Sequence, residues 1–288
     1  MLSTLNCETK QGDTNAGPHL SYLVQPNLHG KPQRLPSLKV LWIRIFSYSG
    51  PTEKETLSLR RSCKLFSKAL KPLPKGSWTS YPHPKYSSLR GLFGRFTELS
   101  ESGSTNIPKL VLIENGIHDE GGNYVYINVS ISIVGESREH CVVIGGLRMN
   151  GKEDDVNVSN LTLRDSKGSG VYRFYGASIH LDNVSVENSG SIGVLVRGTK
   201  RSTMKNCNIS HSKGSGLVVG GGGLMTIDGN GTTIHHNCTG GWSNYYGLFT
   251  HNSSSSIHLV SPLTIETISK NNGGGGNYGG KGSILLLR

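Results

Sequence analysis

The sequence predicts a mainly β fold in which short coils of parallel strand stack on one another. Three successive units repeat one pattern every 23 residues: an asparagine opens an apolar triplet, and a glycine comes ten positions later. The matching columns are Asn160, Asn183 and Asn206, then Ser166, Ser189 and Ser212, then Gly170, Gly193 and Gly216. A repeat this short cannot bury its own apolar side, so the units must share a continuous core. The composition agrees, because 39 glycines and only 17% charged residues favour turns and strands over long helices.

The spacing and residue types favour a right-handed parallel β-helix over leucine-rich repeats. Leucine-rich repeats need several leucines at fixed offsets, whereas these units have two or three aliphatic positions and small polar turns. Parallel strands about 4.8 Å apart place equivalent residues above one another. An asparagine column can then hydrogen-bond from rung to rung, and glycine suits the tight bend before the next strand.

The net charge of +11 is concentrated in the N-terminal part of the chain. Residues 1–105 contain 15 Lys and Arg against 6 Asp and Glu, an excess of 9, whereas residues 106–288 contain 15 against 13, an excess of 2. A basic segment can bind nucleic acid or an acidic protein surface. Aromatic residues are not interleaved with these charges, which disfavours nucleic acid.

Cysteine usage favours a reducing compartment. The five cysteines are an odd number without a CxxC pair, so the sequence predicts neither a disulfide framework nor a zinc site. The N-terminus does not have the character of a signal peptide, and the apolar stretch 38–46 is too short to span a membrane. Eight glycosylation sequons would by themselves argue for secretion, but several fall in predicted strands or in the asparagine column.

The N-terminal third predicts a disordered segment followed by two helices. Residues 1–34 are polar and lack periodicity. Residues 35–71 contain two amphipathic helical patterns that are separated at Gly50-Pro51 and end before Pro72. Such a helical hairpin is too small to be stable alone.

This hairpin resembles the F-box motif in its opening Leu35-Pro36, its Ile45-Phe46-Ser47-Tyr48 run, and the cysteine and aromatic residue of its second helix. It departs from the motif at Ser37 and at Ser49-Gly50-Pro51. The resemblance implies that Leu35, Pro36, Ile45 and Phe46 contact the adaptor of a cullin ligase. The alternatives are a degenerate F-box and a helical pair that only packs against the next domain.

The rest of the chain, residues 87–288, is expected to form the β-helix. Residues 72–86 read as an extended linker because they are rich in proline, and residues 87–99 as a short amphipathic helix. Apolar runs within 110–149 then predict strands. This order resembles the entry to pectin-lyase-like right-handed parallel β-helices, in which the helix covers the open end of the coil.

The last units are less regular. Ile234 continues an aliphatic column after 25 residues instead of 23, so one turn has grown by two. The insertion at 240–249 holds four aromatic residues that we predict to contact a substrate, because aromatic side chains dominate interface energetics: Trp242, Tyr245, Tyr246 and Phe249. Simple packing of the loop is the alternative. The apolar stretch 284–287 suggests that another chain covers this end or that the sequence belongs to a longer parent.

One polar column is a candidate site, although turns of this fold are ordinarily polar. It consists of Asp165, Asn188, His211 and His236, with His235 beside it. Such a column could bind a sugar or a metal, but the histidines match no strong metal spacing. We therefore predict no metal and no cofactor.

The resembled β-helix family includes enzymes that cleave acidic polysaccharides, but their motifs are incomplete in this sequence. Only Asp154-Asp155 resembles their paired carboxylates, and the spacing of Arg197 and Lys200 is wrong. Asp165, Asp182 and Glu187 do not align in register, as paired carboxylates for glycoside hydrolysis would. The sequence therefore predicts no catalytic residue.

The combination resembles F-box proteins that carry carbohydrate-binding-type β-helix repeats. This resemblance implies a non-enzymatic substrate receptor of a cullin-type ubiquitin ligase in the cytoplasm or the nucleus, with a protein adaptor and a protein substrate as partners. A carbohydrate is a second candidate ligand, and a membrane is not expected. Two alternatives stay open: a diverged polysaccharide lyase or hydrolase, and a structural assembly protein.

Overall fold

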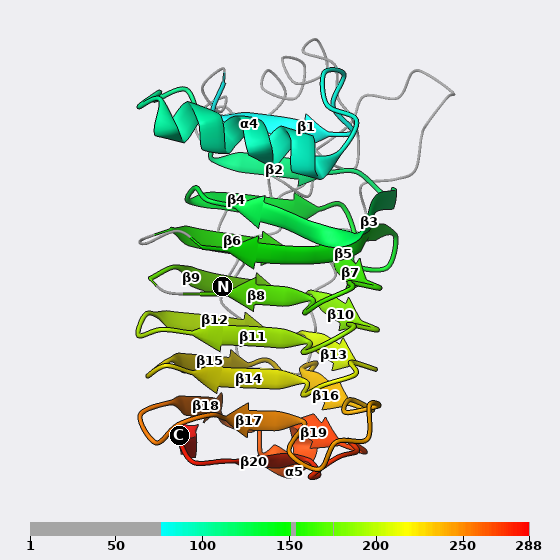
Figure 1. Cartoon of the computed structure of the whole chain (residues 1–288), viewed down its shortest axis with the longest axis vertical. Coiled ribbons are helices and arrows are strands. Elements are labelled where there is room, and N and C mark those ends of the chain that lie inside the picture. The colour runs from blue at the N-terminus through cyan, green and yellow to red at the C-terminus, as the bar shows by residue number, and fades with distance from the viewer. Residues whose placement is uncertain (1–75, 151–153, 175, 288) are drawn as a thin grey trace, which may run out of the picture. The chain divides into compact units, whose positions relative to one another are not determined.

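The computed structural model describes residues 76–150, 154–174 and 176–287. These residues form a stack of coils whose parallel strands line up in three columns, here called walls (Figure 1). The predicted disordered segment 1–34 and the F-box-like hairpin 35–71, with Leu35, Pro36, Ile45 and Phe46, lie outside the described residues.

The first wall is a nine-stranded parallel sheet in which spatial order follows chain order, so each coil lies directly on the previous one. Its strands are β1 (Trp78–Tyr81), β2 (Leu110–Ile113), β4 (Ile131–Gly135), β6 (Asp155–Ser159), β9 (Ser178–Asp182), β12 (Arg201–Lys205), β15 (Leu224–Asp228), β18 (Ser256–Val260) and β21 (Ser283–Leu287).

The second and third walls belong to one twelve-stranded sheet, because β3 (Gly116–Ile127) and β5 (Cys141–Met149) are long enough to run through both. The second wall continues with β7 (Thr162–Arg164), β10 (Ser185–Glu187), β13 (Asn208–Ser210), β16 (Thr233–His235) and β19 (Ser269–Lys270). The third wall continues with β8 (Val171–Arg173), β11 (Val194–Arg197), β14 (Leu217–Gly220), β17 (Leu248–Thr250) and β20 (Tyr278–Gly280). The structure thus confirms the predicted parallel β-helix.

The asparagine column lies at the turn between the first and second walls. Asn160, Asn183 and Asn206 all have a left-handed backbone, with φ of 55°, 56° and 51°. Asparagine tolerates this conformation better than most residues. Asn183 Nδ2 donates to Asn160 Oδ1 at 3.0 Å, and the backbone N–H of Asn183 donates to the Lys205 carbonyl at 2.9 Å. The asparagines are therefore stacked from rung to rung, as predicted.

The glycine column is required by close packing between coils. A Cβ at Gly170, Gly193 or Gly216 would lie only 2.2, 2.4 or 2.5 Å from an aliphatic methyl group of the next coil. Real Cβ atoms do not approach other atoms this closely, so any side chain at these positions would force the coils apart. The 23-residue glycine signal thus has a steric origin.

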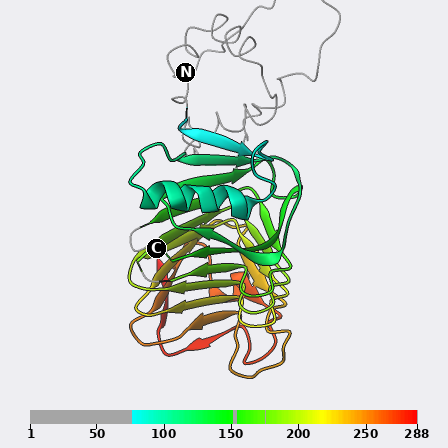
Figure 2. The ribbon, with the colours of Figure 1, turned by 45° about the horizontal axis from the view of Figure 1, so that its top comes forward.

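A helix covers the N-terminal end of the stack, as expected. α4 (Leu89–Glu101) packs against β3, and four of its apolar residues join the core (Figures 1 and 2). Its first turn is capped twice. Ser88 Oγ accepts a hydrogen bond from the Gly91 N–H at 3.0 Å, and Glu120, which is buried, accepts one from the Leu89 N–H at 2.6 Å. A carboxylate at this position also interacts favourably with the helix dipole.

The linker prediction for residues 72–86 is corrected where the structure describes it. Trp78–Tyr81 is extended, but it forms strand β1, which pairs in parallel with β2. The β-helix therefore begins nine residues before residue 87, at Trp78. The prolines around this segment led to the prediction of a linker. Prolines are nevertheless tolerated next to a strand at the edge of a sheet.

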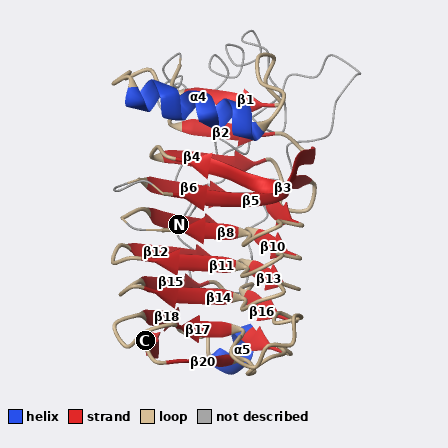
Figure 3. Ribbon diagram, viewed as in Figure 1, coloured by secondary structure: helices blue, strands red, loops and turns tan. Residues whose placement is uncertain are grey.

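At the C-terminal end the coils become irregular, as the spacing of Ile234 suggested. Ile234 pairs with Ile209, and the two extra residues lie in the turn before β16. A short helix, α5 (Ile265–Ile268), precedes β19, so the described helices lie at the two ends of the stack (Figure 3). Leu286 pairs with Leu259 in an inward-facing position, yet it is 59% exposed.

The core is continuous from β1 and α4, where it includes Tyr81, Phe93 and Phe96, through the last coils, where it is aliphatic. Cys141 and Cys207 belong to it as free thiols, and Cys238 is a free thiol that is buried outside this cluster. Burial raises the pKa of Cys141 and of Cys207 to about 12, so both thiols stay protonated and unreactive at neutral pH. No helix within the described ranges is long and apolar enough to cross a membrane.

Candidate ligand-binding surface

The polar column occupies a second left-handed turn position, between the second and third walls. Asp165, Asn188, His211 and His236 have φ values of 55°, 53°, 58° and 52°, and all four side chains are exposed. The structure therefore places these predicted site residues in register. Their backbone conformation alone accounts for short polar side chains at this turn.

The histidines at the end of this column contact one another. The rings of His211 and His236 stack at 5.5 Å, and His235 Nδ1 lies 2.7 Å from His236 Nδ1. His235 Nε2 is also 2.9 Å from Asn208 Oδ1. Partial burial, followed by the charges of His236 and His211, lowers the pKa of His235, which therefore favours its neutral form.

This cluster does not complete a metal site. Within the described residues, no three histidine, cysteine or acidic side chains are placed to hold a metal ion together. His235 and His236 alone offer two nitrogen ligands, whereas zinc sites use three or four protein ligands.

The described carboxylates are mostly dispersed or paired. Glu187 forms an ion pair with Arg164 at 2.8 Å on the second wall. Asp154 is set apart, because burial raises its pKa and the positive charge of Lys200 only partly opposes this shift.

One polar relay crosses three coils of the first wall. Asp155 Oδ1 lies 3.0 Å from His180 Nε2, and His180 Nδ1 lies 2.8 Å from Thr203 Oγ1. This order of acid, imidazole and hydroxyl is the arrangement that activates a nucleophile. Thr203 lines neither of two pockets on the described surface, one at Arg197 and His251 and the other at Tyr124 and Lys167.

The structure divides the predicted aromatic insertion into two pairs. Trp242, which is 63% exposed, stacks on Tyr245 at 5.2 Å. Tyr246 stacks on Phe249 at 5.4 Å, and Phe249 belongs to β17 of the third wall. The four residues therefore belong partly to a loop and partly to the wall surface.

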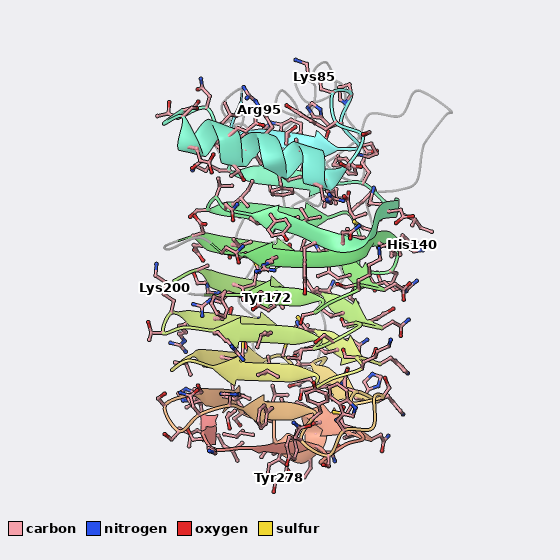
Figure 4. The ribbon with its side chains drawn as sticks, in the orientation of Figure 1. Lys85, Arg95, His140, Tyr172, Lys200 and Tyr278 are labelled. Atoms are coloured by element: carbon pink, nitrogen blue, oxygen red, sulfur yellow. The ribbon has the colours of Figure 1, made fainter. Side chains whose placement is uncertain are left out.

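The third wall carries a surface that the sequence analysis missed. One rank of paired positions that alternates with the core residues runs down it, with Leu195 and Val218 buried: Tyr126, Arg148, Tyr172, Leu195, Val218 and Phe249. Tyr172 lies near the middle of this wall (Figure 4). A second rank two residues further along each strand contains Phe174, Arg197, Gly220 and His251. The signal was the alternation of large residues in YVY at 124–126 and YRF at 172–174.

Arginines and aromatic rings alternate at the N-terminal half of this wall. The Arg148 guanidinium lies 4.8 Å from the centroid of the Tyr172 ring, 5.7 Å from that of Tyr126 and 5.8 Å from that of Tyr124. Tyr172 stacks on Phe174 at 5.9 Å, and the Arg197 guanidinium lies 6.0 Å from the Phe174 ring. We call Tyr124, Tyr126, Arg148, Tyr172, Phe174 and Arg197 the aromatic–arginine patch.

A pocket lies beside this patch, at the turn that leads back to the first wall. It has a volume of about 510 Å³ and is called here the Arg197 pocket. Its lining residues are Phe174, Arg197, Gly198, Gly221, His251 and Asn252. Gly220 lies between Arg197 and His251. Because it has no side chain, the space between them stays open; a Cβ at this position would lie 3.5 Å from Arg197 Cγ and 3.3 Å from His251 Cβ.

Arg173 holds the turn beneath this pocket in place. Its side chain is fully buried and points inward, where its guanidinium donates to the carbonyls of Arg197, Gly198 and Lys200. Burial lowers the pKa of Arg173 to about 10, so it remains charged at neutral pH. No ion pair joins Arg173 to a carboxylate in the described part of the chain. A buried charge without a counter-ion is costly, and here it fixes the backbone from Arg197 to Lys200.

Comparison with known proteins gives one family match. Residues 145–286 match the family model described as "Right handed beta helix region". No curated protein and no solved structure matches the chain. The match covers the regular coils, the third-wall strands from β8 onward and the Arg197 pocket, but neither α4 nor the F-box-like residues. The stacked parallel coils and this match together establish that the chain carries right-handed β-helix repeats.

Proposed function

We propose that this chain is a non-enzymatic recognition module and that its third wall binds a protein partner. The observation that carries the proposal is the aromatic–arginine patch, in which Arg148 contacts three tyrosine rings at 4.8 to 5.8 Å. Tyrosine and arginine are enriched among the residues that dominate binding energy at protein interfaces.

The geometry of the patch suits binding better than turnover. Its rings and guanidinium groups are held by neighbouring rungs of a rigid sheet, so little side-chain freedom is lost when a partner docks. The patch itself contains no carboxylate, histidine, serine or cysteine that could act as a nucleophile or a general base.

Photo-crosslinking tests the location of the binding surface. A photoreactive phenylalanine analogue at Tyr172 should crosslink a partner from cell extract. The same analogue at Arg201, exposed on the first wall, should not. Equal crosslinking from both positions, or none from Tyr172, would contradict the proposal.

A role as substrate receptor of a cullin-type ubiquitin ligase is the finer form of this proposal. It rests on the resemblance of residues 35–71 to the F-box motif and places the protein in the cytoplasm or nucleus. A pull-down with the cullin adaptor should retain the full chain and should lose the double variant Ile45→Asp/Phe46→Asp. If the wild-type chain is not retained, the ligase role fails while the binding surface on the third wall is unaffected.

Hydrolysis is the second candidate function, and the relay of Asp155, His180 and Thr203 favours it. In this role Thr203 Oγ1 would attack the carbonyl carbon of an ester while His180 accepts its proton and passes it to the leaving alcohol; water, activated by the same imidazole, would then release the acyl group from Thr203. Release of product from acetylated or methylated pectin would have to disappear in Thr203→Val, which keeps the side-chain shape. Activity that persists in this variant would remove the relay as its source.

A further inference from the structure

We infer that the Arg197 pocket binds a carboxylate carried by an acidic side chain of the protein partner. This inference rests on the proposed function and names the chemistry that the partner must present. It concerns a subsite beside the tyrosines of the patch, so the two can be tested separately.

The first observation is that the Arg197 side chain has no hydrogen bond or ion pair within the described part of the chain. Arg197 is half-buried in the pocket lining, and its guanidinium lies 6.0 Å from the centroid of the Phe174 ring. A guanidinium presents five N–H donors in a fork that matches the two oxygens of a carboxylate. Stacking against Phe174 restricts the direction in which this fork points.

The second observation is the positive charge beneath the pocket. The charged guanidinium of Arg173 is fully buried and donates to the carbonyls of Arg197 and Gly198, two residues of the pocket wall. The carbonyls that Arg173 occupies face inward, so they cannot repel an anion that arrives from outside. The pocket therefore favours a negative group over a neutral one.

The third observation is the shape and polarity of the remaining lining. Phe174 and the two glycines of the lining offer apolar surface, and Asn252 Oδ1 is already occupied by the Gly221 N–H at 2.9 Å. The Gly198 N–H is likewise bonded to the Gly220 carbonyl at 3.2 Å. Apart from Arg197 and the His251 ring the lining is largely apolar, so the ligand needs one anionic end on an apolar stem. Glutamate and aspartate side chains have this form.

The geometry of the neighbouring patch favours a peptide or protein as the carrier of that carboxylate. The pocket lies next to Tyr172 and Phe174, which stack on each other at 5.9 Å. A partner that covers these rings with its own apolar residues would bring an acidic side chain over Arg197. A free anion would gain nothing from these rings.

A displayed random-peptide library, selected on the full chain, tests the inference. Bound peptides should be enriched in Asp or Glu, and replacing the acidic residue by Asn or Gln should weaken binding about tenfold or more, as expected for a hydrogen bond to a charged group. Arg197→Gln should weaken binding to a similar extent. Gly220→Leu, which projects a side chain between Arg197 and His251, should also block it.

Arg201→Gln is the matched control, because it removes the same charge from the first wall, where Arg201 donates to Thr226 Oγ1. It should bind the peptides as the wild type does, and thermal melting should show that Arg197→Gln and Gly220→Leu remain folded.

Three outcomes would overturn the inference. Peptides that lose binding in Tyr172→Ala but keep it in Arg197→Gln would leave the proposed function intact and remove the carboxylate subsite. Failure to select any peptide would count against both. Binding of oligogalacturonate that depends on Arg197, without any acidic peptide, would assign the pocket to an acidic sugar instead.

Discussion

The asparagine column and the polar column share one backbone conformation, yet they differ in which residues they accept. All seven residues have φ between 51° and 58°. The asparagine column repeats one residue type, and its amides are buried or half-buried, with Asn183 bonded to Asn160 at 3.0 Å. The polar column contains aspartate, asparagine and histidine, and all of them are exposed. A left-handed turn thus requires only a residue type that tolerates positive φ, whereas a side-chain hydrogen bond between rungs requires asparagine at each position.

The largest effect tests the stacking on which this comparison depends. Gly193→Ala places a methyl group 2.4 Å from Ile209 Cγ2 and 2.6 Å from the Gly216 carbonyl oxygen, so neighbouring coils must move apart. We expect a loss of about 3 kcal/mol in the free energy of unfolding, the upper end for overpacking, measured by urea denaturation.

Gly94→Ala is the matched control for this substitution. Gly94 lies in α4, and a methyl group added to it would meet no atom within 4 Å, so the change should stabilise the helix by up to about 1 kcal/mol. Equal destabilisation by the two alanines would show that coil spacing is not fixed by the glycine column.

Replacing Asn183 by glycine separates the contribution of the left-handed backbone from that of the side-chain hydrogen bond. Asn183→Gly keeps the left-handed turn without strain but removes the amide that donates to Asn160. The expected loss is about 1 to 2 kcal/mol, because Asn160 Oδ1 is left without this donor in a buried position. Urea denaturation measures it, and a change smaller than about 0.5 kcal/mol, the size expected of an exposed site, would remove the distinction between the columns.

The same substitution in the polar column should have little effect. Asn188→Gly changes an exposed side chain at φ of 53°, so stability should stay within about 0.5 kcal/mol. Asn188→Ala should cost about 1 to 2 kcal/mol, because alanine is strained in this conformation. If glycine proves as damaging as alanine at this position, the side chain of Asn188 has a role beyond the turn.

The fold could be predicted because its key residues recur at a regular interval. The aromatic–arginine patch could not, because its residues do not recur at such an interval. Residues equivalent to Asn183 and Gly193 recur because the hydrogen bonds between rungs and the close contacts between coils repeat with every coil. The residues they require therefore appear at a fixed interval in the sequence. Strand β1 was missed because it has no counterpart at that interval. Arg148 and Tyr172 were missed for a related reason, since they meet only after the chain has completed a coil.

Site prediction failed most clearly where chemistry depends on burial. Arg173 follows an ordinary strand pattern in the sequence, and nothing in that pattern indicates that its guanidinium turns inward to bind three carbonyls. The aromatic insertion was a sounder guide, because Phe249 does lie on the third wall. Whether Trp242 or Phe249 contacts a partner stays a prediction.

The smallest expected effect concerns the end of the polar column, where His235 contacts His236 and lies near His211. The pKa of His235 is lowered in the folded protein, chiefly by burial, whereas in the unfolded chain it returns to about 6.5. Between these two values the unfolded state binds more protons, so stability falls as the pH drops through about 6.5 and levels off below the folded pKa. The melting temperature of the wild type should therefore fall more steeply between about pH 7.5 and pH 5.5 than that of His235→Gln, which cannot be protonated there.

His258→Gln, at a histidine of the first wall outside this cluster, is the control and should follow the wild type. Parallel curves for all three proteins would mean that protonation of His235 does not lower the stability of the fold. The side chains at this end of the polar column would then matter as little for stability as we expect for Asn188.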